Sequence, residues 1–122
     1  MRIPFLNLST QNSEISDDLS LKFKNSLKNG QFIKGEELNL FEKEFANYVN
    51  AKYCIGVGNG LDALALSLRA LDIKKGDEII VPSNTFIATW LSISNLGAIP
   101  IPVEPNEFYN IDPDLIKDRI TE

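Results

Sequence analysis

The chain has 122 residues, of which 43% are hydrophobic, and its 12 Lys and Arg against 17 Asp and Glu give a formal net charge of −5. This composition indicates one globular domain or a piece of one, and it excludes a disordered tail, a coiled coil and a collagen-like fibre. With no histidine and a single cysteine, Cys54, the chain alone cannot assemble Cys/His zinc sites, Ser-His-Asp triads or Cys-His dyads. No metal site is predicted.

The distribution of charge and of apolar runs limits the expected partners. The basic residues are scattered, so no basic stripe can follow a phosphate backbone, and nucleic acid is not expected. The apolar runs at 78–82 and 98–103 are far shorter than the roughly 20 residues that cross a bilayer. No charged-then-apolar leader opens the sequence. We therefore expect no membrane association and a cytoplasmic location.

Residues 1–51 are expected to form an extended arm followed by two helices. Residues 1–10 are apolar, contain a proline and show no period. Leu19, Phe23 and Leu27 recur four apart, which predicts a helix at about 14–29 that Ser13 or Ser16 would cap and Gly30 would end. After a short apolar loop, a second helix is predicted from an apolar stripe, with an asparagine at its C-terminal cap; these residues are Leu38, Phe41, Phe45, Tyr48 and Asn50.

From residue 52, strands and helices alternate. The expected strands and helices are 53–57, 60–71, 78–81, 85–95, 99–103 and a helix from 113 that Asp112 caps. Two consecutive strand-helix-strand units predict an α/β fold with a parallel sheet flanked by helices. Because the last helix has hardly begun by Glu122, residues 52–122 are expected to be the start of a larger domain, with the chain ending mid-fold.

The turns after the first two strands are the expected ligand-binding positions, because ligands lie beyond the carboxyl ends of parallel strands. Gly60 and Leu61 open a helix, and their free amides at its positive end favour an anion such as phosphate. The glycines of this turn fit a simple strand-to-helix connection equally well. Asp62 would have to point away from a bound phosphate.

The second turn places Phe86 near a helix start on the same edge of the sheet, where a planar ring could stack on it. The competing interpretation is a core residue, because large aromatics usually serve packing. Trp90, four residues on, is expected in the core. A dinucleotide fingerprint counted from Gly56 meets Leu61 where a glycine is required, and the second strand does not end in an acid. Both departures argue against a nicotinamide-dependent oxidoreductase.

The ordered motifs resemble the DegT-type (DegT/DnrJ/StrS) nucleotide-sugar aminotransferases, which are pyridoxal-phosphate enzymes of the aspartate-aminotransferase fold, fold type I. The resemblance covers nearly the whole chain, in the segments 3–6, 35–42, 57–64, 76–82, 84–89, 97–98 and 109–113. The sequence of residues 85–91 and 102–105 is most similar to that of family members that aminate a 3-keto-6-deoxyhexose carried on thymidine diphosphate. It implies that residues 52–122 begin the cofactor-binding large domain of such an enzyme.

The resemblance also implies roles for single residues. The amides of Gly60 and Leu61 would hold the phosphate of pyridoxal 5′-phosphate, and Phe86 would stack on its pyridine ring. Many relatives have threonine at the position of Leu61, so here only the backbone amide can serve. Phe32 and Lys34 match a segment that approaches the active site across a dimer interface in relatives, and they are the substrate-binding candidates. No catalytic residue is assigned, because the family's Schiff-base lysine lies beyond the matched segment.

The function implied is transamination of a keto group on a nucleotide-linked sugar by a homodimer, with glutamate as the amino donor. The process would be deoxyaminosugar biosynthesis, such as that of lipopolysaccharide O-antigen. The 122 residues alone are not expected to transaminate. Two alternatives stay open, namely a pyridoxal-phosphate dehydratase acting on a similar sugar and a non-catalytic domain that binds a phosphate-bearing ligand or a partner on the same scaffold.

Overall fold

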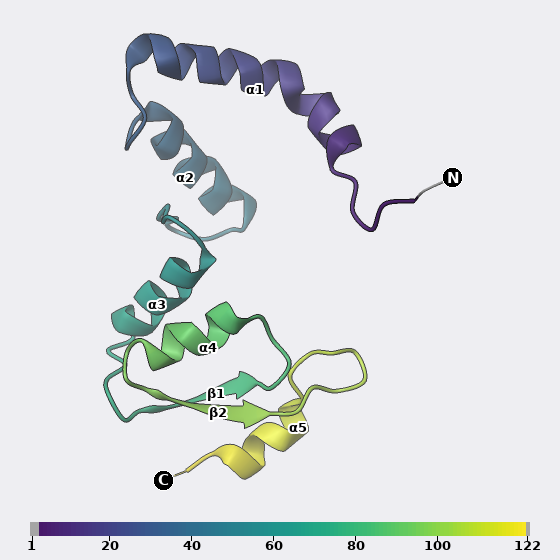
Figure 1. The fold of residues 1–122 in the computed structure, drawn as a ribbon. Coiled ribbons are helices and arrows are strands. Elements are labelled where there is room, and N and C mark those ends of the chain that lie inside the picture. Colours follow the sequence, from purple (N-terminus) through teal and green to yellow (C-terminus); the bar gives the residue numbers. More distant parts are fainter. Residues whose placement is uncertain (1–2, 122) are drawn as a thin grey trace. The chain divides into compact units, whose positions relative to one another are not determined.

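The computed structural model describes residues 3–121 and divides into two compact units, Met1–Gly56 and Val57–Glu122 (Figure 1). The sequence-based division falls after residue 51. The structure keeps the extended segment 52–56 with the first unit, where the backbone N–H of Gly56 donates to Glu42 Oε1 over 2.7 Å. A side-chain contact to the preceding helix thus assigns this segment, and sequence periodicity does not register such a contact.

The first unit contains helices α1 (Ser9–Asn29) and α2 (Glu36–Tyr48). The predicted start of the first helix is wrong, because Ser13 lies within α1 and its hydroxyl donates to Thr10 O. Asn7 Oδ1 instead accepts from the backbone N–H of Ser9, which satisfies one of the first amides of the helix. The predicted end is confirmed by Gly30 in the left-handed conformation, with φ 66°. Residues 1 and 2 of the predicted arm lie outside the described residues.

Few side chains are buried in the first unit. Among its described residues Ala46 of α2 is buried, whereas the predicted apolar stripe of α1 is exposed throughout. The contacts that organise α2 are a stack of Phe41 on Phe45, with ring centroids 5.6 Å apart, and an ion pair from Glu37 to Lys22 of α1 at 2.9 Å. Helical periodicity therefore predicts these helices correctly, although it does not produce a core between them.

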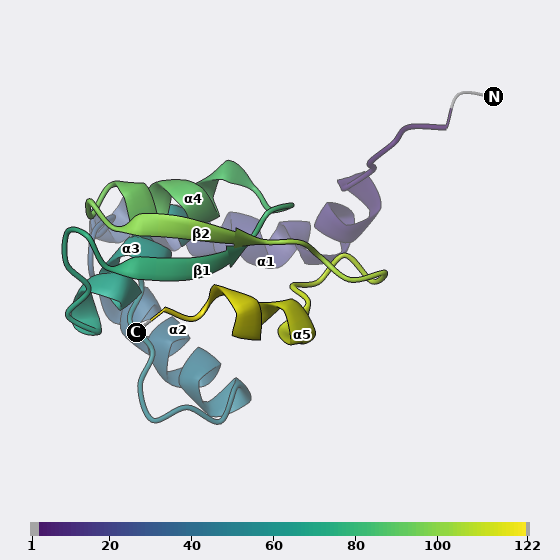
Figure 2. The ribbon, with the colours of Figure 1, turned by 90° about the horizontal axis from the view of Figure 1, so that it is seen from below.

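The second unit is an α/β arrangement around a two-stranded parallel sheet. Its elements are α3 (Gly60–Ala70), β1 (Glu78–Pro82), α4 (Ile87–Ser94), β2 (Ile99–Val103), α5 (Pro113–Ile116) and the short 3-10 helix η1 (Lys117–Arg119). β1 and β2 pair in parallel with Glu78 opposite Ile99. Helix α4 covers one face of the sheet and α5 lies on the other side (Figure 1, Figure 2). The parallel sheet and the crossover helix α4 confirm the predicted α/β class.

The predicted strand at 53–57 is not formed. This segment is extended, but within residues 3–121 no strand pairs with it, so the observed sheet has two strands and the prediction of three is wrong. A strand exists only through its ladder of hydrogen bonds to a neighbour. An apolar run such as Tyr53–Val57 predicts the extended conformation but does not guarantee a partner.

The core of the second unit lies between α4 and the sheet. Val81 of β1, Ile93 of α4 and Ala98 before β2 are buried together, and Leu68, Ile73, Ile79 and Trp90 pack around them. Trp90 is therefore in the core, as expected. Asp112 caps α5 as predicted, since its Oδ1 accepts from the N–H of Asp114 over 2.9 Å. Among residues 3–121, none of the helices combines the length and apolarity that a bilayer span requires.

Candidate functional site

The start of helix α3 is fixed by Asn59. Asn59 Oδ1 accepts from the backbone N–H of Asp62 at 2.9 Å, and its Nδ2 donates to Asp62 Oδ2 at 3.0 Å. The asparagine thus binds the third residue of the helix through both side-chain atoms, in a variant of the capping box. Asn59 is not among the site residues predicted from the sequence, although an asparagine three residues before an acid at a helix start is a recognisable signal.

The first two amides of α3, those of Gly60 and Leu61, remain available to a ligand. Within the described chain neither donates a hydrogen bond to a protein acceptor, because Asn59 binds the amide of Asp62. A helix N-terminus with free N–H groups attracts an anion through both the donors and the helix dipole. The carboxylate of Asp62 is held by the Asn59 side chain, and Asp62 does not line the pocket described below.

Gly60 leaves open space beside these amides. A Cβ added at Gly60 would meet no atom within 4 Å, and the backbone there is not in the left-handed region. The fold therefore does not require a glycine at this position. At Gly58, in contrast, a Cβ would lie 3.0 Å from Asp62 Oδ2, so that glycine lets the capping pair approach. The space beside Gly60 is open, and a side chain at this position would extend into it.

Phe86 lies across the same pocket. It is the N-cap residue of α4, with extended backbone angles of φ −65° and ψ 145°, and its side chain is 79% exposed. The competing interpretation of Phe86 as a core residue is wrong, because its side chain is exposed and it is not among the residues that pack in the core. The start of α3 and the first turns of α4 enclose about 720 Å³, lined by residues that include Asn59, Gly60, Leu61, Phe86 and Thr89. Three sequence-predicted site residues, Gly60, Leu61 and Phe86, thus line one pocket.

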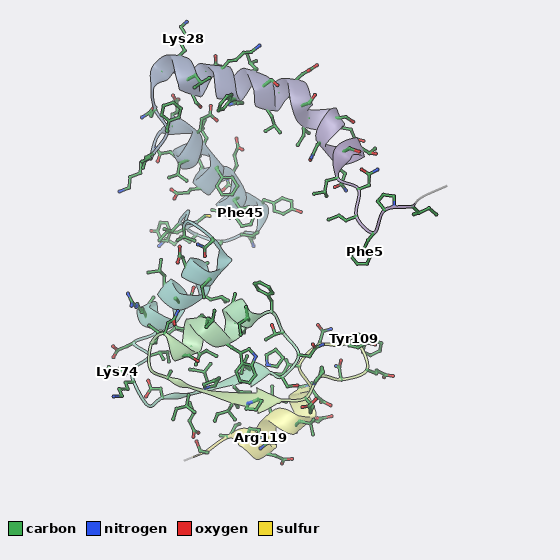
Figure 3. All side chains as sticks on the ribbon, viewed as in Figure 1. Phe5, Lys28, Phe45, Lys74, Tyr109 and Arg119 are labelled. Atoms are coloured by element: carbon green, nitrogen blue, oxygen red, sulfur yellow. The ribbon has the colours of Figure 1, made fainter. Side chains whose placement is uncertain are left out.

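The pocket contains no charged side chain. Its lining is mostly apolar, with the amides of α3, Asn59, Ser67 and Thr89 as the polar groups. Lys74 and Tyr109 lie at opposite ends of the sheet (Figure 3), and Lys74, in the turn before β1, pairs with Asp72 at 2.7 Å. Attraction of an anion to the pocket therefore relies on backbone dipoles. Within residues 3–121, no cluster of His, Cys, Asp or Glu is arranged to hold a metal ion.

Phe32 and Lys34 belong to the first unit. They lie in the loop between α1 and α2 and line a pocket of about 220 Å³, formed by residues of that unit alone. Phe32 is exposed, and Lys34 adopts a left-handed conformation with φ 47°. Their assignment to substrate binding stays a prediction.

Residues 13–122 match the DegT/DnrJ/EryC1/StrS aminotransferase family, and the chain belongs to this family. The resemblance inferred from the motifs is thereby confirmed. The chain is 52% identical over 120 residues to the dTDP-3-amino-3,6-dideoxy-alpha-D-galactopyranose transaminase of Aneurinibacillus thermoaerophilus, a match that covers 98% of this chain and 33% of that protein. The chain spans about a third of the length of the curated relatives it matches.

Two solved structures support the fold. DesV of S. venezuelae, in complex with a ketimine intermediate, superposes with a TM-score of 0.93 at 45% identity, over 98% of this chain and 33% of that one. The ntda protein of Bacillus subtilis, with bound cofactor PMP, superposes with a TM-score of 0.90 at 36% identity, over 98% and 28%. The predicted relation to the pyridoxal-phosphate transferase fold is confirmed by these similarities.

Proposed function

We propose that this chain contributes the phosphate-binding and ring-binding residues of a pyridoxal-phosphate-dependent aminotransferase acting on a nucleotide-linked sugar. The observation that supports this most directly is that Gly60 and Leu61, with their free amides, and the exposed Phe86 line the same pocket. Membership of the aminotransferase family supports the reaction class. The names of relatives, with their dTDP-linked 3-amino sugars, support the sugar nucleotide as the substrate class.

The pocket suits a planar ring that carries a phosphate. The two amides supply donors for phosphate oxygens, the missing Cβ at Gly60 allows close approach, and the mostly apolar lining suits a planar ring. Phe86 offers a face for offset stacking with a pyridine ring. When bound, pyridoxal phosphate supplies the electron sink of transamination, and the protein supplies orientation and phosphate binding.

The finer assignment follows the sequence resemblance. We propose a dTDP-linked 3-keto-6-deoxyhexose as the acceptor and glutamate as the amino donor, in deoxyaminosugar biosynthesis such as that of lipopolysaccharide O-antigen. A homodimer in the cytoplasm, with Phe32 and Lys34 contributing to substrate binding, completes this assignment. This assignment is supported by the sequence of the matched motifs and by the family membership.

Cofactor binding can be tested with two substitutions that act in opposite directions. Gly60→Ala meets no steric obstacle in the fold, and alanine favours a helix by up to about 1 kcal/mol over glycine, so the variant should be at least as stable as wild type. Its methyl group fills the space beside the amides, and we expect the dissociation constant of pyridoxamine phosphate to rise about tenfold or more. Leu61→Thr adds a hydroxyl within reach of the phosphate and should tighten binding.

Pyridoxamine phosphate is the suitable probe, because its amine forms no covalent bond to a lysine and its affinity reports the pocket alone. Titration by isothermal calorimetry, together with thermal unfolding of each variant without ligand, separates binding from folding. Unchanged affinity of Gly60→Ala would contradict the proposal that the phosphate binds in the open space beside the amides of Gly60 and Leu61. The native protein's intact mass gives a second test, because a mass matching 13.6 kDa leaves no Schiff-base lysine and would favour the non-catalytic ligand-binding alternative.

A further inference from the structure

The exposed ring of Phe86 needs an anchor that its own side chain does not provide. A side chain buried in a core is oriented by its neighbours, whereas Phe86 is largely exposed and caps α4 without a side-chain hydrogen bond. A ring that stacks on a ligand must be held near the stacking orientation beforehand, or ordering it reduces the binding free energy. The restraints on this ring therefore have to come from the backbone on either side of it.

Thr89, in the first turn of α4, restrains the backbone on both sides of Phe86. Its N–H donates to the carbonyl oxygen of Phe86 over 3.0 Å, which fixes the peptide that follows the ring. Its hydroxyl lies 3.0 Å from the hydroxyl of Thr85, the residue before the ring, and this half-buried pair shares a hydrogen bond. One residue thus ties the corner at which an extended segment turns into a helix.

Thr89 is itself anchored to the core. Its carbonyl oxygen accepts from the hydroxyl of Ser92 over 2.8 Å, and Ser92 is 2% exposed beside the buried Ile93. The restraint therefore runs from the packed side of α4 through Thr89 to Thr85 and to the loop that carries the ring. Thr89 also lines the pocket shared by Gly60, Leu61 and Phe86.

We propose that the hydroxyl of Thr89 is a positioning group, which holds Phe86 in the orientation that stacks on the cofactor ring. This inference rests on the proposed function, because it assumes that Phe86 receives a pyridine ring. A hydrogen bond in a half-buried setting contributes enough to shift the balance between a held and a free loop. The hydroxyl acts through the backbone of Phe86 and does not have to touch the ligand.

The central test replaces Thr89 with valine, which keeps the branched shape and the N–H but removes the hydroxyl. We expect the dissociation constant of pyridoxamine phosphate to rise about tenfold, equivalent to about 1.4 kcal/mol. The circular dichroism that the protein induces in the pyridine absorption band should lose intensity for each molecule bound, because the ring is held less rigidly. Thr89→Ser, which restores a hydroxyl, should recover both the affinity and the induced signal.

A double-mutant cycle with Thr85→Val identifies the partner. If the two hydroxyls act as a pair, each single variant should weaken binding and the double variant should be little weaker than either one. Ser94→Ala is the matched control, since it removes an exposed hydroxyl of the same helix that does not line the pocket. The control should bind like wild type.

The outcomes distinguish this inference from the proposed function. If wild type binds pyridoxamine phosphate and Thr89→Val binds equally well, the positioning role is wrong and the cofactor site stands. The positioning role is also wrong if the serine variant fails to recover binding, or if affinity falls while the induced signal per bound molecule is unchanged. Failure of the wild-type protein to bind the probe at all would overturn the proposed function itself.

Discussion

The two units differ in how their exposed residues are held. In the first unit, α1 and α2 carry ordered helical turns, yet among the described residues only Ala46 is buried. In the second unit, Val81, Ile93 and Ala98 form a core, and the turns on either side of it are tied by side-chain hydrogen bonds. The pocket lined by Gly60, Leu61 and Phe86 lies in the second unit. In that unit, exposed residues are positioned by hydrogen bonds to elements that pack on a core.

The loop after β2 illustrates the same principle. Asn106 Oδ1 accepts from the backbone N–H groups of Phe108 at 3.0 Å and of Asn110 at 3.3 Å, so one amide orders a turn whose aromatic residues are exposed. This loop carries Tyr109 in the left-handed region, with φ 62°, as the loop of the first unit that carries Phe32 does at Lys34, so the hydrogen bonds of Asn106, and not the backbone region, distinguish the two loops. The second unit is therefore ordered by side-chain hydrogen bonds within its loops as well as by its core.

Truncation in the core should show the largest contrast between the units. Ile93→Ala removes a side chain that is 3% exposed, and we expect it to lower the free energy of unfolding by about 2–5 kcal/mol. Leu27→Ala in α1 removes one that is 54% exposed, and the change should stay within about 0.5 kcal/mol. Urea unfolding of both variants checks the difference. Equal losses would mean that the face of α1 is covered in the protein as it exists.

Most of the regular structure follows from short-range rules that the sequence displays. Gly30 ends α1 as predicted, because glycine readily adopts the left-handed conformation of a helix C-cap. Asp112 begins α5 as predicted, because its carboxylate accepts a hydrogen bond from a free amide of the first turn. The segment 53–57 is the counterexample, since strand formation depends on a partner at a distance along the chain. The exposure of the apolar stripe of α1 could not be predicted either, because periodicity shows which face is apolar and not whether another element covers it.

Loss of the α3 cap should have the next largest effect. Asn59→Ala removes both bonds to Asp62, and we expect the free energy of unfolding to fall by about 1 kcal/mol. The released carboxylate of Asp62 should also weaken binding of pyridoxamine phosphate, because it is no longer held by the Asn59 side chain and repels the phosphate. Asn59→Ser retains a capping oxygen without adding a charge beside Asp62 and serves as the matched variant for stability. Unchanged stability of Asn59→Ala would show that the cap is dispensable.

Some of the pocket residues could be predicted from the sequence and others could not. It was predictable that Gly60 and Leu61 open a helix with free amides, because a glycine-rich turn precedes the helix, whereas their binding of the cofactor phosphate stays a prediction. The choice for Phe86 between core and pocket was settled only by the structure, in which its side chain is exposed and lines the pocket. Thr89 gave no signal, since its contacts run to the backbone of Phe86 and to Thr85, and such geometry appears only in the folded chain.

A smaller effect on stability is expected from the hydrogen bond between Glu42 and the extended segment 52–56. Glu42 Oε1 accepts from Gly56 N–H over 2.7 Å in an exposed setting, so Glu42→Ala should lower the free energy of unfolding by less than about 1 kcal/mol. The sharper readout is hydrogen exchange at the amide of Gly56, which should accelerate strongly, while Glu44→Ala leaves it unchanged. Slow exchange in Glu42→Ala would reveal a different acceptor for this amide.

The smallest effect concerns the ion pair between α1 and α2. The hydrogen bond from Lys22 to Glu37, reinforced by the charge of that carboxylate, raises the pKa of Lys22 above 10.5. Because the pKa is higher in the folded state, the stabilisation is fully present below pH 10.5 and is lost as the pH rises through the folded-state pKa. Both side chains are more than half exposed, so solvent and salt screen the pair.

Titration of the Lys22 side-chain methylene protons by NMR can isolate this interaction from the rest of the fold. In Glu37→Gln the pKa of Lys22 should fall towards its ordinary value, and the alkaline loss of stability should shrink with it. High salt should have the same effect on the wild-type protein. If Lys22 titrates identically in both proteins, the pair does not persist in solution, and the link between α1 and α2 is weaker than the distance of 2.9 Å indicates. That result would sharpen the contrast with the second unit, whose turns are anchored to a core.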